Sequence, residues 1–436
     1  MELPLNKYLE EVNKANLITY SGKVSKIIGL TIESIGPAVE LGEICSIYPL
    51  KNKSPIEAEV VGFKDEIVLL MPLGEIGGIG PGSKVVARGH YLQIDVGEEM
   101  LGRVLSGLGN PIDGGAKPFT TSKYDAYNSP PNPLLRKKIR EVLPLGIKAI
   151  DSMITCGKGQ RIGIFAGSGV GKSTLMGMMA RNTTADVNVI ALIGERGREV
   201  REFIESDLGE EGLRRSVVIV ATSDQPALVR VKGALLATAA AEYFRDQGKD
   251  VLLMMDSLTR FSMAQREVGL AIGEPPVSRG YPPSVFAELP KLLERAGTSD
   301  EGSITGLYTV LVDGDDFNEP ITDAVRGILD GHILLSRKLA DVGYYPAINI
   351  IGSVSRVMPL LVSEEHMKMS RNIKEIVSTF RDAEDLINIG AYKHGTNPAI
   401  DLAIDKQSEI NAFLTQGMYD RHTFEEITKT LMGILD

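Results

Sequence analysis

The feature that most restricts the fold of this 436-residue chain is an apolar run that enters a glycine-rich turn and then a helical stretch. The run RIGIF at 161–165 is followed directly by AGSGVGKSTLMGMMA at 166–180. A strand, a glycine loop and a helix in this order are typical of α/β proteins. The predicted strands are Arg161–Phe165, Val187–Ile193, Ser216–Ala221, Val251–Met255 and Ile304–Val312. Helical stretches such as Val229–Arg245 alternate with them, which predicts a parallel sheet with helices on both faces.

The glycine turn has the composition of a phosphate-binding loop. Glycines at 167, 169 and 171 let backbone N–H groups turn inward around phosphates, and the helix that follows adds its dipole. Lys172 is predicted to reach the β and γ phosphates of ATP, and Ser173 to ligate Mg²⁺. The predicted nucleotide contacts in the loop are Gly167, Ser168, Gly169, Val170, Gly171, Lys172, Ser173 and Thr174. A glycine turn that only caps a helix is the alternative, and the strand-loop-helix context favours the phosphate site.

Two acidic residues follow apolar strands, at the sheet edge where α/β proteins bind ligands. Asp256 ends the run VLLMMD and is the predicted carboxylate that holds Mg²⁺ through water. Glu195 follows VIALIG and is the candidate base that orients the attacking water. A salt bridge between Glu195 and a nearby arginine is the alternative. Hydrolysis of ATP needs a positioned water and charge neutralisation, so one acid, one lysine, one metal and one arginine suffice.

An arginine after another apolar strand is a candidate for that neutralising charge. Arg356 lies in NIIGSVSRVM, where its side chain could point out of the subunit. An arginine supplied across an interface accelerates such reactions by about 10³ to 10⁵. From spacing alone, a surface arginine without a catalytic role is the main alternative.

Turn signals and periodicity divide the chain into three predicted domains. Short alternating runs between Gly and Pro turns predict a small amino-terminal β-barrel, with Lys23–Ile32, Ala58–Phe63 and Glu66–Met71 as examples. A proline-rich stretch predicts an extended crossover without packed elements, and the last part of the chain has helical periodicity. The predicted bounds are 1–92 for the amino-terminal segment and β-barrel, 93–357 for the ATPase domain with its crossover over 107–145, and 358–436 for the helical domain.

The first 16 residues carry a short apolar stripe at helical spacing, formed by Leu5, Tyr8, Leu9 and Val12. A helix with one apolar face packs either on its own barrel or on a partner, and the sequence leaves both open.

Composition restricts the partners and the compartment. A net charge of −10 argues against a nucleic-acid-binding surface, because duplex affinity comes largely from basic side chains. The chain has no run of 18 or more uncharged apolar residues and no secretory signal at its start. Cys45 and Cys156 are too few for a disulfide framework and are interpreted as small apolar side chains in a reducing compartment. The sequence predicts a cytoplasmic protein.

Over nearly its whole length the sequence resembles the catalytic subunits of rotary ATP synthases and, more closely, the ATPases of flagellar and virulence type III protein export. The matching stretches include TCGKGQRIGIFAGSGVGKST, IGERGREVREFI and ILDGHILLSRKLADVGYYPAINI. PPNPLLRKKI and AIGEPPVSRGYPPSVF are more similar to the export branch. The resemblance implies a β-barrel domain, a RecA-like ATPase domain and a C-terminal helical domain, assembled as a homohexamer with sites at the subunit interfaces.

The resemblance also implies roles for individual residues. Arg356 of one subunit would reach the site of the next, Arg196 would contact the γ-phosphate, and Tyr345 would stack near the adenine. The synthase has a second aromatic residue beside the adenine, whereas this sequence has Met418. The acidic lever segment of the synthase is not evident between 367 and 388. Both differences fit an export ATPase.

The partners implied by the resemblance are a negative-regulator stator protein, which would dock on the amino-terminal segment, and a coiled-coil stalk protein in the ring pore. Export chaperone-substrate complexes and the export gate are implied as well. Family members lie at the inner face of the cytoplasmic membrane without inserting into it.

The leading interpretation is ATP hydrolysis coupled to export of flagellar proteins through a type III apparatus. A virulence type III secretion ATPase is the nearest alternative, since it differs in cargo and not in chemistry. A hexameric RNA translocase is disfavoured by the acidic charge and by the lack of an aromatic RNA-stacking motif. A non-catalytic rotary subunit would keep a degenerate site, whereas Lys172, Glu195 and Asp256 are all present.

Overall fold

The computed structural model describes residues 20–51, 54–120, 122–312 and 319–435, so the apolar stripe predicted near the amino terminus lies outside the described residues. The chain divides into two compact units. Within the described residues, one unit comprises 20–92 and 268–274, and the other comprises 93–267 and 275–435. The three predicted domain bounds stay predictions. In the described ranges, no helix has the length and apolarity that a bilayer crossing requires.

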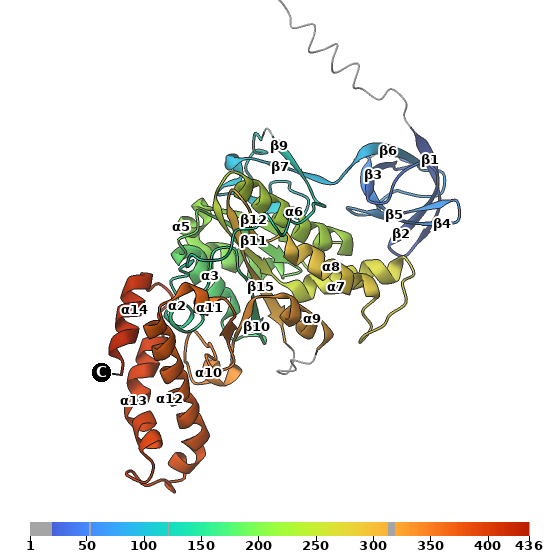
Figure 1. Cartoon of the computed structure of the whole chain (residues 1–436). Coiled ribbons are helices and arrows are strands. Elements are labelled where there is room, and N and C mark those ends of the chain that lie inside the picture. The colour runs from blue at the N-terminus through green and yellow to red at the C-terminus, as the bar shows by residue number, and fades with distance from the viewer. Residues whose placement is uncertain (1–19, 52–53, 121, 313–318, 436) are drawn as a thin grey trace, which may run out of the picture. The chain divides into compact units, whose positions relative to one another are not determined.

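The first unit is built on a closed barrel of six antiparallel strands in the order β1-β2-β5-β4-β3-β6 (Figure 1). The strands are β1 (Ser21–Ile28), β2 (Thr31–Ile35), β3 (Glu43–Tyr48), β4 (Ile56–Lys64), β5 (Ile67–Pro72) and β6 (Lys84–Tyr91). The predicted barrel is therefore confirmed. The run Lys23–Ile32 is not one strand, because the chain turns between β1 and β2 at Gly29, whose φ of 56° suits glycine.

The second unit contains a nine-stranded sheet in the order β17-β16-β10-β15-β13-β11-β12-β8, with β14 paired to β15 off this path. Its strands are β8 (Val104–Ser106), β10 (Arg161–Ala166), β11 (Val187–Ile193), β12 (Ser216–Ala221), β13 (Asp250–Asp256), β14 (Gly297–Thr298), β15 (Ser303–Leu311), β16 (Gly331–Leu334) and β17 (Val354–Ser355). All pairs are parallel except β14 with β15 and β16 with β17. The predicted parallel sheet is confirmed, with β8, which lies just before the predicted crossover, as a strand that was not predicted.

Helices bury both faces of this sheet. All seven residues of β11 are buried, and alternate residues of a strand face opposite sides. Ile193 faces α6 (Ala227–Asp246), since a Cβ on Gly233 of α6 would lie 3.1 Å from its Cδ1. Residues at the alternate positions of β11, such as Leu192, belong to a cluster that includes α3 (Lys172–Asn182). A strand that is buried on both faces has a continuous apolar sequence. The first and last residues of β11 and β12 could therefore be predicted from the sequence.

The helices of the chain beyond residue 92 are α2 (Lys148–Met153), α3 (Lys172–Asn182), α4 (Gly197–Glu202), α5 (Gly209–Arg214), α6 (Ala227–Asp246), α7 (Leu258–Ala271), α8 (Pro283–Glu294), α9 (Pro320–Ile328), α10 (Arg337–Asp341), α11 (Met358–Leu361), α12 (Glu364–Asn388), α13 (Pro398–Leu414) and α14 (Phe424–Gly433). The described residues also include a 3-10 turn, η1 (Glu98–Met100), and a π-helical turn, η2 (Phe203–Leu208).

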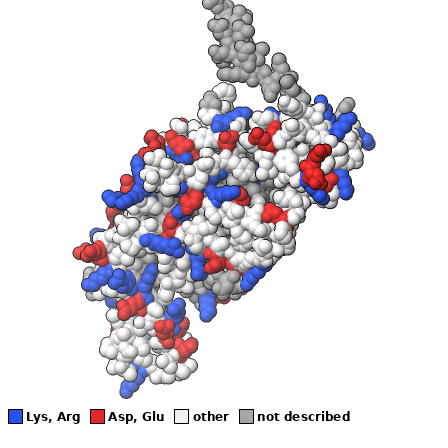
Figure 2. Space-filling model, turned by 45° about the vertical axis from the view of Figure 1, so that its right-hand side comes forward, with Lys and Arg blue, Asp and Glu red and all other residues white. Residues whose placement is uncertain are grey.

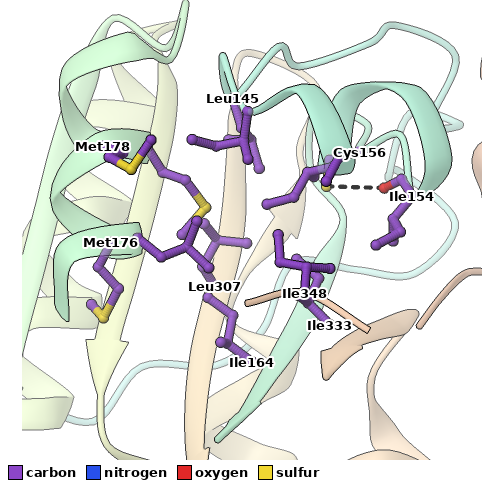
Figure 3. Close-up of a cluster of buried hydrophobic side chains, with 14 of the residues drawn as sticks. Leu145, Ile154, Cys156, Ile164, Met176, Met178, Leu307, Ile333 and Ile348 are labelled. Atoms are coloured by element: carbon purple, nitrogen blue, oxygen red, sulfur yellow. Dashed lines mark hydrogen bonds between the residues drawn. The ribbon is translucent and has the colours of Figure 1, made fainter. Parts of the chain in front are cut away.

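A hydrophobic cluster joins α3 to the sheet and to the segment before the phosphate loop. Figure 3 shows Met176 and Met178 of α3 together with Leu145, Ile164 of β10 and Leu307 of β15. Because one packed cluster contains both the phosphate-loop helix and the strands that flank it, α3 has a fixed position relative to the sheet.

Both cysteines are buried and unpaired with each other, as expected for small apolar side chains. Burial raises the pKa of the Cys45 thiol to about 12. Cys156 donates to the Ile154 carbonyl at 3.5 Å (Figure 3), and burial raises its pKa well above the usual value.

The C-terminal helices share the core of the second unit. Ile373 of α12, Ile410 of α13 and Ile427 of α14 all belong to the cluster that contains α3. The helical periodicity predicted for the last part of the chain is interrupted, since α13 ends at Leu414 and α14 starts after the Thr423 capping box.

The predicted extended crossover over 107–145 contains a strand that the sequence analysis did not anticipate. β9 (Ser122–Asp125) pairs with β7 (Gln93–Val96) in a two-stranded sheet. The segment after β9 is held by a buried ion pair, because Arg295 donates to the Ala126 carbonyl at 2.7 Å and to both carboxylate oxygens of Glu242, at 2.7 and 2.9 Å.

This ion pair generates a stability prediction, because the side chains of Arg295 and Glu242 are only 3% and 0% exposed. Arg295→Leu would leave the Glu242 carboxylate buried without its partner. We expect it to lower the free energy of unfolding by about 3–5 kcal/mol. The measurement is the urea midpoint, and the double variant Arg295→Leu/Glu242→Leu should recover most of the loss.

The matched control is Arg214→Leu, whose side chain is 80% exposed and pairs with an exposed Glu210. It should change the free energy of unfolding by less than about 1 kcal/mol. Equal midpoints for Arg295→Leu and Arg214→Leu would contradict the importance of the buried pair.

Candidate active site

The predicted phosphate loop connects β10 to α3. Gly169 and Gly171 have φ values of 77° and 86°, in the left-handed region that favours glycine, and α3 begins at Lys172 directly after the second of them. The backbone N–H groups of the first turn of α3 have no partner within the helix, so they are available to an anion. The local structure is the strand, loop and helix that the sequence predicts.

The other residues predicted to contact the nucleotide differ in how exposed their side chains are. Ser168 is exposed, Val170 is buried in the core, and Ser173 is exposed on the first turn of α3. Thr174 is hydrogen-bonded to the Asp207 carboxylate and so faces the protein. The side chains of Ser173 and Thr174 thus point to different environments, and of the two only Ser173 is open to a ligand.

The structure brings Lys172, Asp256 and Glu195 together. The Lys172 Nζ lies 2.5 Å from Asp256 Oδ1 and 3.7 Å from Glu195 Oε1. All three side chains are largely buried, with exposed fractions of 12%, 5% and 14%. The residues are far apart in sequence, and their convergence is the main support for an active site here.

The sheet order explains this convergence. β10, β15, β13 and β11 are consecutive parallel strands, so the residues that end or follow them meet at one edge. β15 contributes Thr309, whose hydroxyl donates to Asp256 Oδ1 at 2.7 Å. Thr309 therefore fixes the carboxylate that pairs with Lys172. Sequence reasoning missed Thr309, because a threonine inside an apolar strand carries no signal of its own.

Burial and mutual charge set the electrostatics of the cluster. Burial, followed by the nearby Asp256 carboxylate, raises the pKa of Glu195 to about 7, although Lys172 opposes the shift. Burial alone would lower the pKa of Lys172, but the carboxylates of Asp256 and Glu195 raise it, so the lysine stays charged. A carboxyl group with a pKa near neutrality is suited to act on a proton, which fits the role predicted for Glu195.

Glu199 of α4 is a third acidic residue of the site, and sequence reasoning missed it. A hydrogen bond between the two carboxyl groups lowers the pKa of Glu199 and helps to raise that of Glu195. Glu199 also accepts from Arg196 Nη1 at 2.8 Å. The Arg196 side chain is 76% exposed, so it lies beside the site and is not part of the Lys172 cluster in this structure.

Arg260 of α7 is a further neighbour that was not singled out from the sequence, although it lies in the DSLTRF stretch after Asp256. Its side chain packs on the residue before Glu195, since a Cβ on Gly194 would be 2.8 Å from Arg260 Cβ. The buried Nε has no hydrogen-bond partner among the described residues.

Tyr345 lies beside the phosphate loop, in agreement with a role near the nucleotide. A Cβ on Gly171 would lie 3.3 Å from its ring, and the side chain is 45% exposed. Its carbonyl accepts from the Gln416 N–H at 3.0 Å. The buried Gln416 side chain in turn bonds the Gly146 carbonyl and the Lys148 N–H, both at 2.9 Å. The segment after α13 is therefore tied to Tyr345.

Arg356 is exposed and lies at the opposite edge of the sheet from the phosphate loop. Its N–H donates to the Asp330 carbonyl at 3.0 Å, and the Asp330 N–H donates to the carbonyl of Arg161, the first residue of β10. The loop begins after six residues of β10, about 20 Å away. Arg356 therefore does not reach the site of its own chain.

The oxygen donors at the site suit a hard divalent cation. Asp256 offers a carboxylate and Ser173 a hydroxyl, and Mg²⁺ is bound by one or two protein oxygens together with substrate phosphates and water. No cluster of three or more His, Cys, Asp or Glu side chains that could hold a metal ion occurs in the described ranges. The residues present fit a metal that is shared with a phosphate ligand.

The pKa of Glu195 generates a prediction about stability. Ionisation of a group whose pKa is about 7 in the folded chain, against 4.5 ordinarily, costs folding free energy as the pH rises through this window. Glu195→Gln carries no such charge. At about pH 8 we expect the free energy of unfolding of Glu195→Gln to exceed that of wild type by about 1–2 kcal/mol. The difference should vanish toward about pH 4.5. Urea midpoints without nucleotide measure this.

Glu199→Gln is the matched control and should show the opposite sign. Because the pKa of Glu199 is lowered, its ionised form stabilises the fold, and removal of the charge should cost stability at high pH. If the midpoint of Glu195→Gln ran parallel to wild type at every pH, ionisation of Glu195 would carry no folding cost.

Comparison with known families covers most of the chain. Residues 24–89 match the β-barrel domain of the ATP synthase alpha/beta family, and 146–355 match its nucleotide-binding domain. Residues 362–433 match the C-terminal domain of the type III secretion ATPase EscN. The three matches follow one another along the chain in the order of the barrel, the sheet and the C-terminal helices.

A "Flagellum-specific ATP synthase" of Bacillus subtilis is 56% identical over 414 residues, which are 95% of this chain and 94% of that protein. The assembled ATPase EscN from the type III secretion system of enteropathogenic E. coli has a TM-score of 0.90 at 46% identity, covering 95% of this chain and all of that one. EscN in complex with its central stalk EscO gives a TM-score of 0.88 at 45% identity, with the same coverage. The chain belongs to the family of flagellum-specific and type III secretion ATPases, within the wider ATP synthase alpha/beta family.

Proposed function

We propose that this ATPase hydrolyses Mg²⁺-ATP at the interfaces of a homohexameric ring and that hydrolysis drives the export of flagellar proteins through a type III secretion apparatus. The observation that carries the proposal is the contact of Lys172 with both Asp256 and Glu195 at the edge of a parallel sheet. A lysine after a phosphate loop, an acid at a strand end and an acid with a pKa near 7 are the parts that phosphoryl transfer to water requires.

Each residue has a defined role in this mechanism. The loop N–H groups hold the phosphates, and Lys172 moves from its carboxylate partners to the β and γ phosphates. Glu195 orients the attacking water and accepts its proton, for which a pKa near 7 is suited. Arg196, which is exposed and linked to Glu195 through Glu199, turns to the γ-phosphate. Tyr345 stacks near the adenine.

Ser173 and Asp256 would hold Mg²⁺, the latter through water. The metal would neutralise charge on the phosphates, as divalent cations do in such sites. When the Lys172 ammonium leaves Asp256 for the phosphates, Thr309 still donates to that carboxylate and keeps it oriented.

Ring assembly follows from the position of Arg356. Because its backbone lies beside the start of β10, whose length of about 20 Å separates it from the loop, Arg356 can neutralise a transition state only in the site of a neighbouring subunit. Identical chains that each carry a loop and a distant arginine close into a ring through a repeated interface. The assembled form of the relative EscN supports this arrangement.

The partners are also proposals. The complex of EscN with its central stalk EscO favours a coiled-coil stalk protein in the pore of this ring. A stator protein on the amino-terminal segment, export chaperone-substrate complexes and the export gate complete the set. The ring would lie in the cytoplasm, at the inner face of the membrane.

Cargo separates the flagellar proposal from its alternative, a virulence secretion ATPase with the same chemistry. The 56% identity to a flagellum-specific protein, against 46% to the virulence protein EscN, favours the flagellar system. An RNA translocase is disfavoured, because the face shown in Figure 2 has basic and acidic side chains interspersed without a broad basic band among its described residues.

The role of Glu195 is tested by Glu195→Gln, which removes the base and leaves the loop unchanged. We expect ATP affinity to stay within a few-fold of wild type, while the turnover rate falls by about 10²–10⁴. Fluorescence of a labelled nucleotide measures binding, and phosphate release measures turnover. Glu202→Gln, an exposed neighbour on α4, should keep the wild-type rate. Wild-type turnover in Glu195→Gln would reject the base assignment.

Arg356→Ala tests the shared site. For wild type, specific activity should rise steeply with protein concentration as rings form. Arg356→Ala should bind ATP as a monomer and lose the concentration-dependent activity by about 10³-fold. Phosphate release with mass measured in parallel gives both quantities, and the exposed Arg214→Ala serves as the control. Activity that is independent of concentration and unchanged in Arg356→Ala would mean that each chain is self-sufficient.

A further inference from the structure

The segment after β16 runs beside the phosphate loop. β16 pairs in parallel with β10, with Leu334 opposite Phe165. The Leu335 N–H then donates to the Phe165 carbonyl at 2.9 Å, so pairing continues to the end of the strand. The segments that follow these two strands leave the sheet side by side. The segment after β10 forms the phosphate loop, and the segment after β16 enters α10.

The segment 336–347 forms a loop that is closed by backbone hydrogen bonds where it leaves the sheet. The Ser336 N–H donates to the Ala347 carbonyl at 2.8 Å, and the Asn349 N–H donates to the Leu334 carbonyl at 2.8 Å. Everything between 336 and 347 therefore projects from the sheet as one unit. It contacts the phosphate loop twice, through the ring of Tyr345 near the end of the loop and through Arg337 near its start.

Arg337 is the first residue of α10, and its guanidinium lies on the start of the phosphate loop. Its Nη2 donates to the Ser168 carbonyl at 3.3 Å. The same atom would lie 3.2 Å from a Cβ on Gly167, so a side chain at that position would displace it. Arg337 is exposed, and within the described residues its guanidinium forms no ion pair that would compete with the bond to Ser168.

The bond to Ser168 controls the direction of the next amide. In a trans peptide the carbonyl of residue 168 and the N–H of residue 169 lie in one plane and point in opposite directions. If the carbonyl is held outward by Arg337, the Gly169 N–H is held inward, where a phosphate would be. Gly169 has a φ of 77° and would otherwise be free to rotate this plane, because glycine has few steric limits.

We propose that Arg337 is a positioning residue for the phosphate-binding loop, which fixes the 168–169 peptide so that its amide faces the polyphosphate of the nucleotide. The inference rests on the proposed function, and it gives this residue a role different from that of Tyr345. Arg337 acts on phosphate binding, whereas Tyr345 acts on the base. An arginine suits this role because its planar fork loses less freedom per hydrogen bond than a lysine.

Competition with inorganic tripolyphosphate separates the two roles, because this ligand has the phosphates of ATP without the base. For Arg337→Ala we expect the dissociation constants of ATP and tripolyphosphate to rise by the same factor, about tenfold. For Tyr345→Ala only that of ATP should rise. Displacement of a fluorescent nucleotide measures both constants without turnover. Hydrogen exchange should also show faster exchange of the Gly169 amide in Arg337→Ala.

Lys338→Ala is the matched control, since Lys338 is the next residue of α10 and is exposed. The dissociation constants of ATP and tripolyphosphate for Lys338→Ala should equal those for wild type. Arg337→Gln keeps a neutral hydrogen-bond donor, so its dissociation constants should lie between those of wild type and Arg337→Ala. It replaces the alanine variant if that variant does not fold. Unchanged tripolyphosphate binding in folded Arg337→Ala or Arg337→Gln would overturn the inference. Wild type that binds no ATP would instead reject the proposed function.

Discussion

The pairing of one buried lysine with two carboxylates is the interaction on which the rest of the second unit depends. Asp256 ends β13, Glu195 follows β11 and Lys172 follows the loop after β10, so the three meet only because β10, β15, β13 and β11 are parallel neighbours. Without the lysine, two buried carboxylates would face each other, at a cost of several kcal/mol. The Lys172 ammonium neutralises the Asp256 carboxylate. In the proposed mechanism the same ammonium turns from this carboxylate to the phosphates of the nucleotide.

The same sheet separates the phosphate loop from Arg356, the residue proposed to act on a neighbouring site. Its carboxyl edge carries the loop and the acids, and its amino edge carries Arg356 next to Asp330. A strand of six residues lies between them, and no side chain spans that distance. In the proposed mechanism, one chain therefore presents the nucleotide site at one end of the strands and Arg356, for the site of a neighbouring subunit, at the other. This polarity is a property of the parallel sheet itself, and it explains why assembly and catalysis are linked in the proposed mechanism.

Much of this arrangement was predictable, because buried parallel strands are continuous apolar runs. β11 and β12 were bounded to the residue, and the loop, Glu195 and Asp256 followed from their position after such runs. The partners of these residues were not predictable. Thr309 and Arg260 reach the site through strand order and helix packing, which the sequence does not display. β9 was missed because its residues pair with β7 far away in sequence, and the break before α14 because the apolar period continues across it.

The attachment of Gln416 to Tyr345 gives the C-terminal helices a mechanical role. One residue holds the carbonyl of Tyr345 with its backbone, and with its side chain it holds the turn that leads into α2. The surrounding helices share one packed core with α3, and such cores transmit strain because they compress little. A tilt of α13 therefore pulls on the residue that would touch the adenine. A torque on these helices would therefore change the contact between Tyr345 and the adenine. Exchange of the nucleotide would in turn displace the helices and exert force on a partner bound to them.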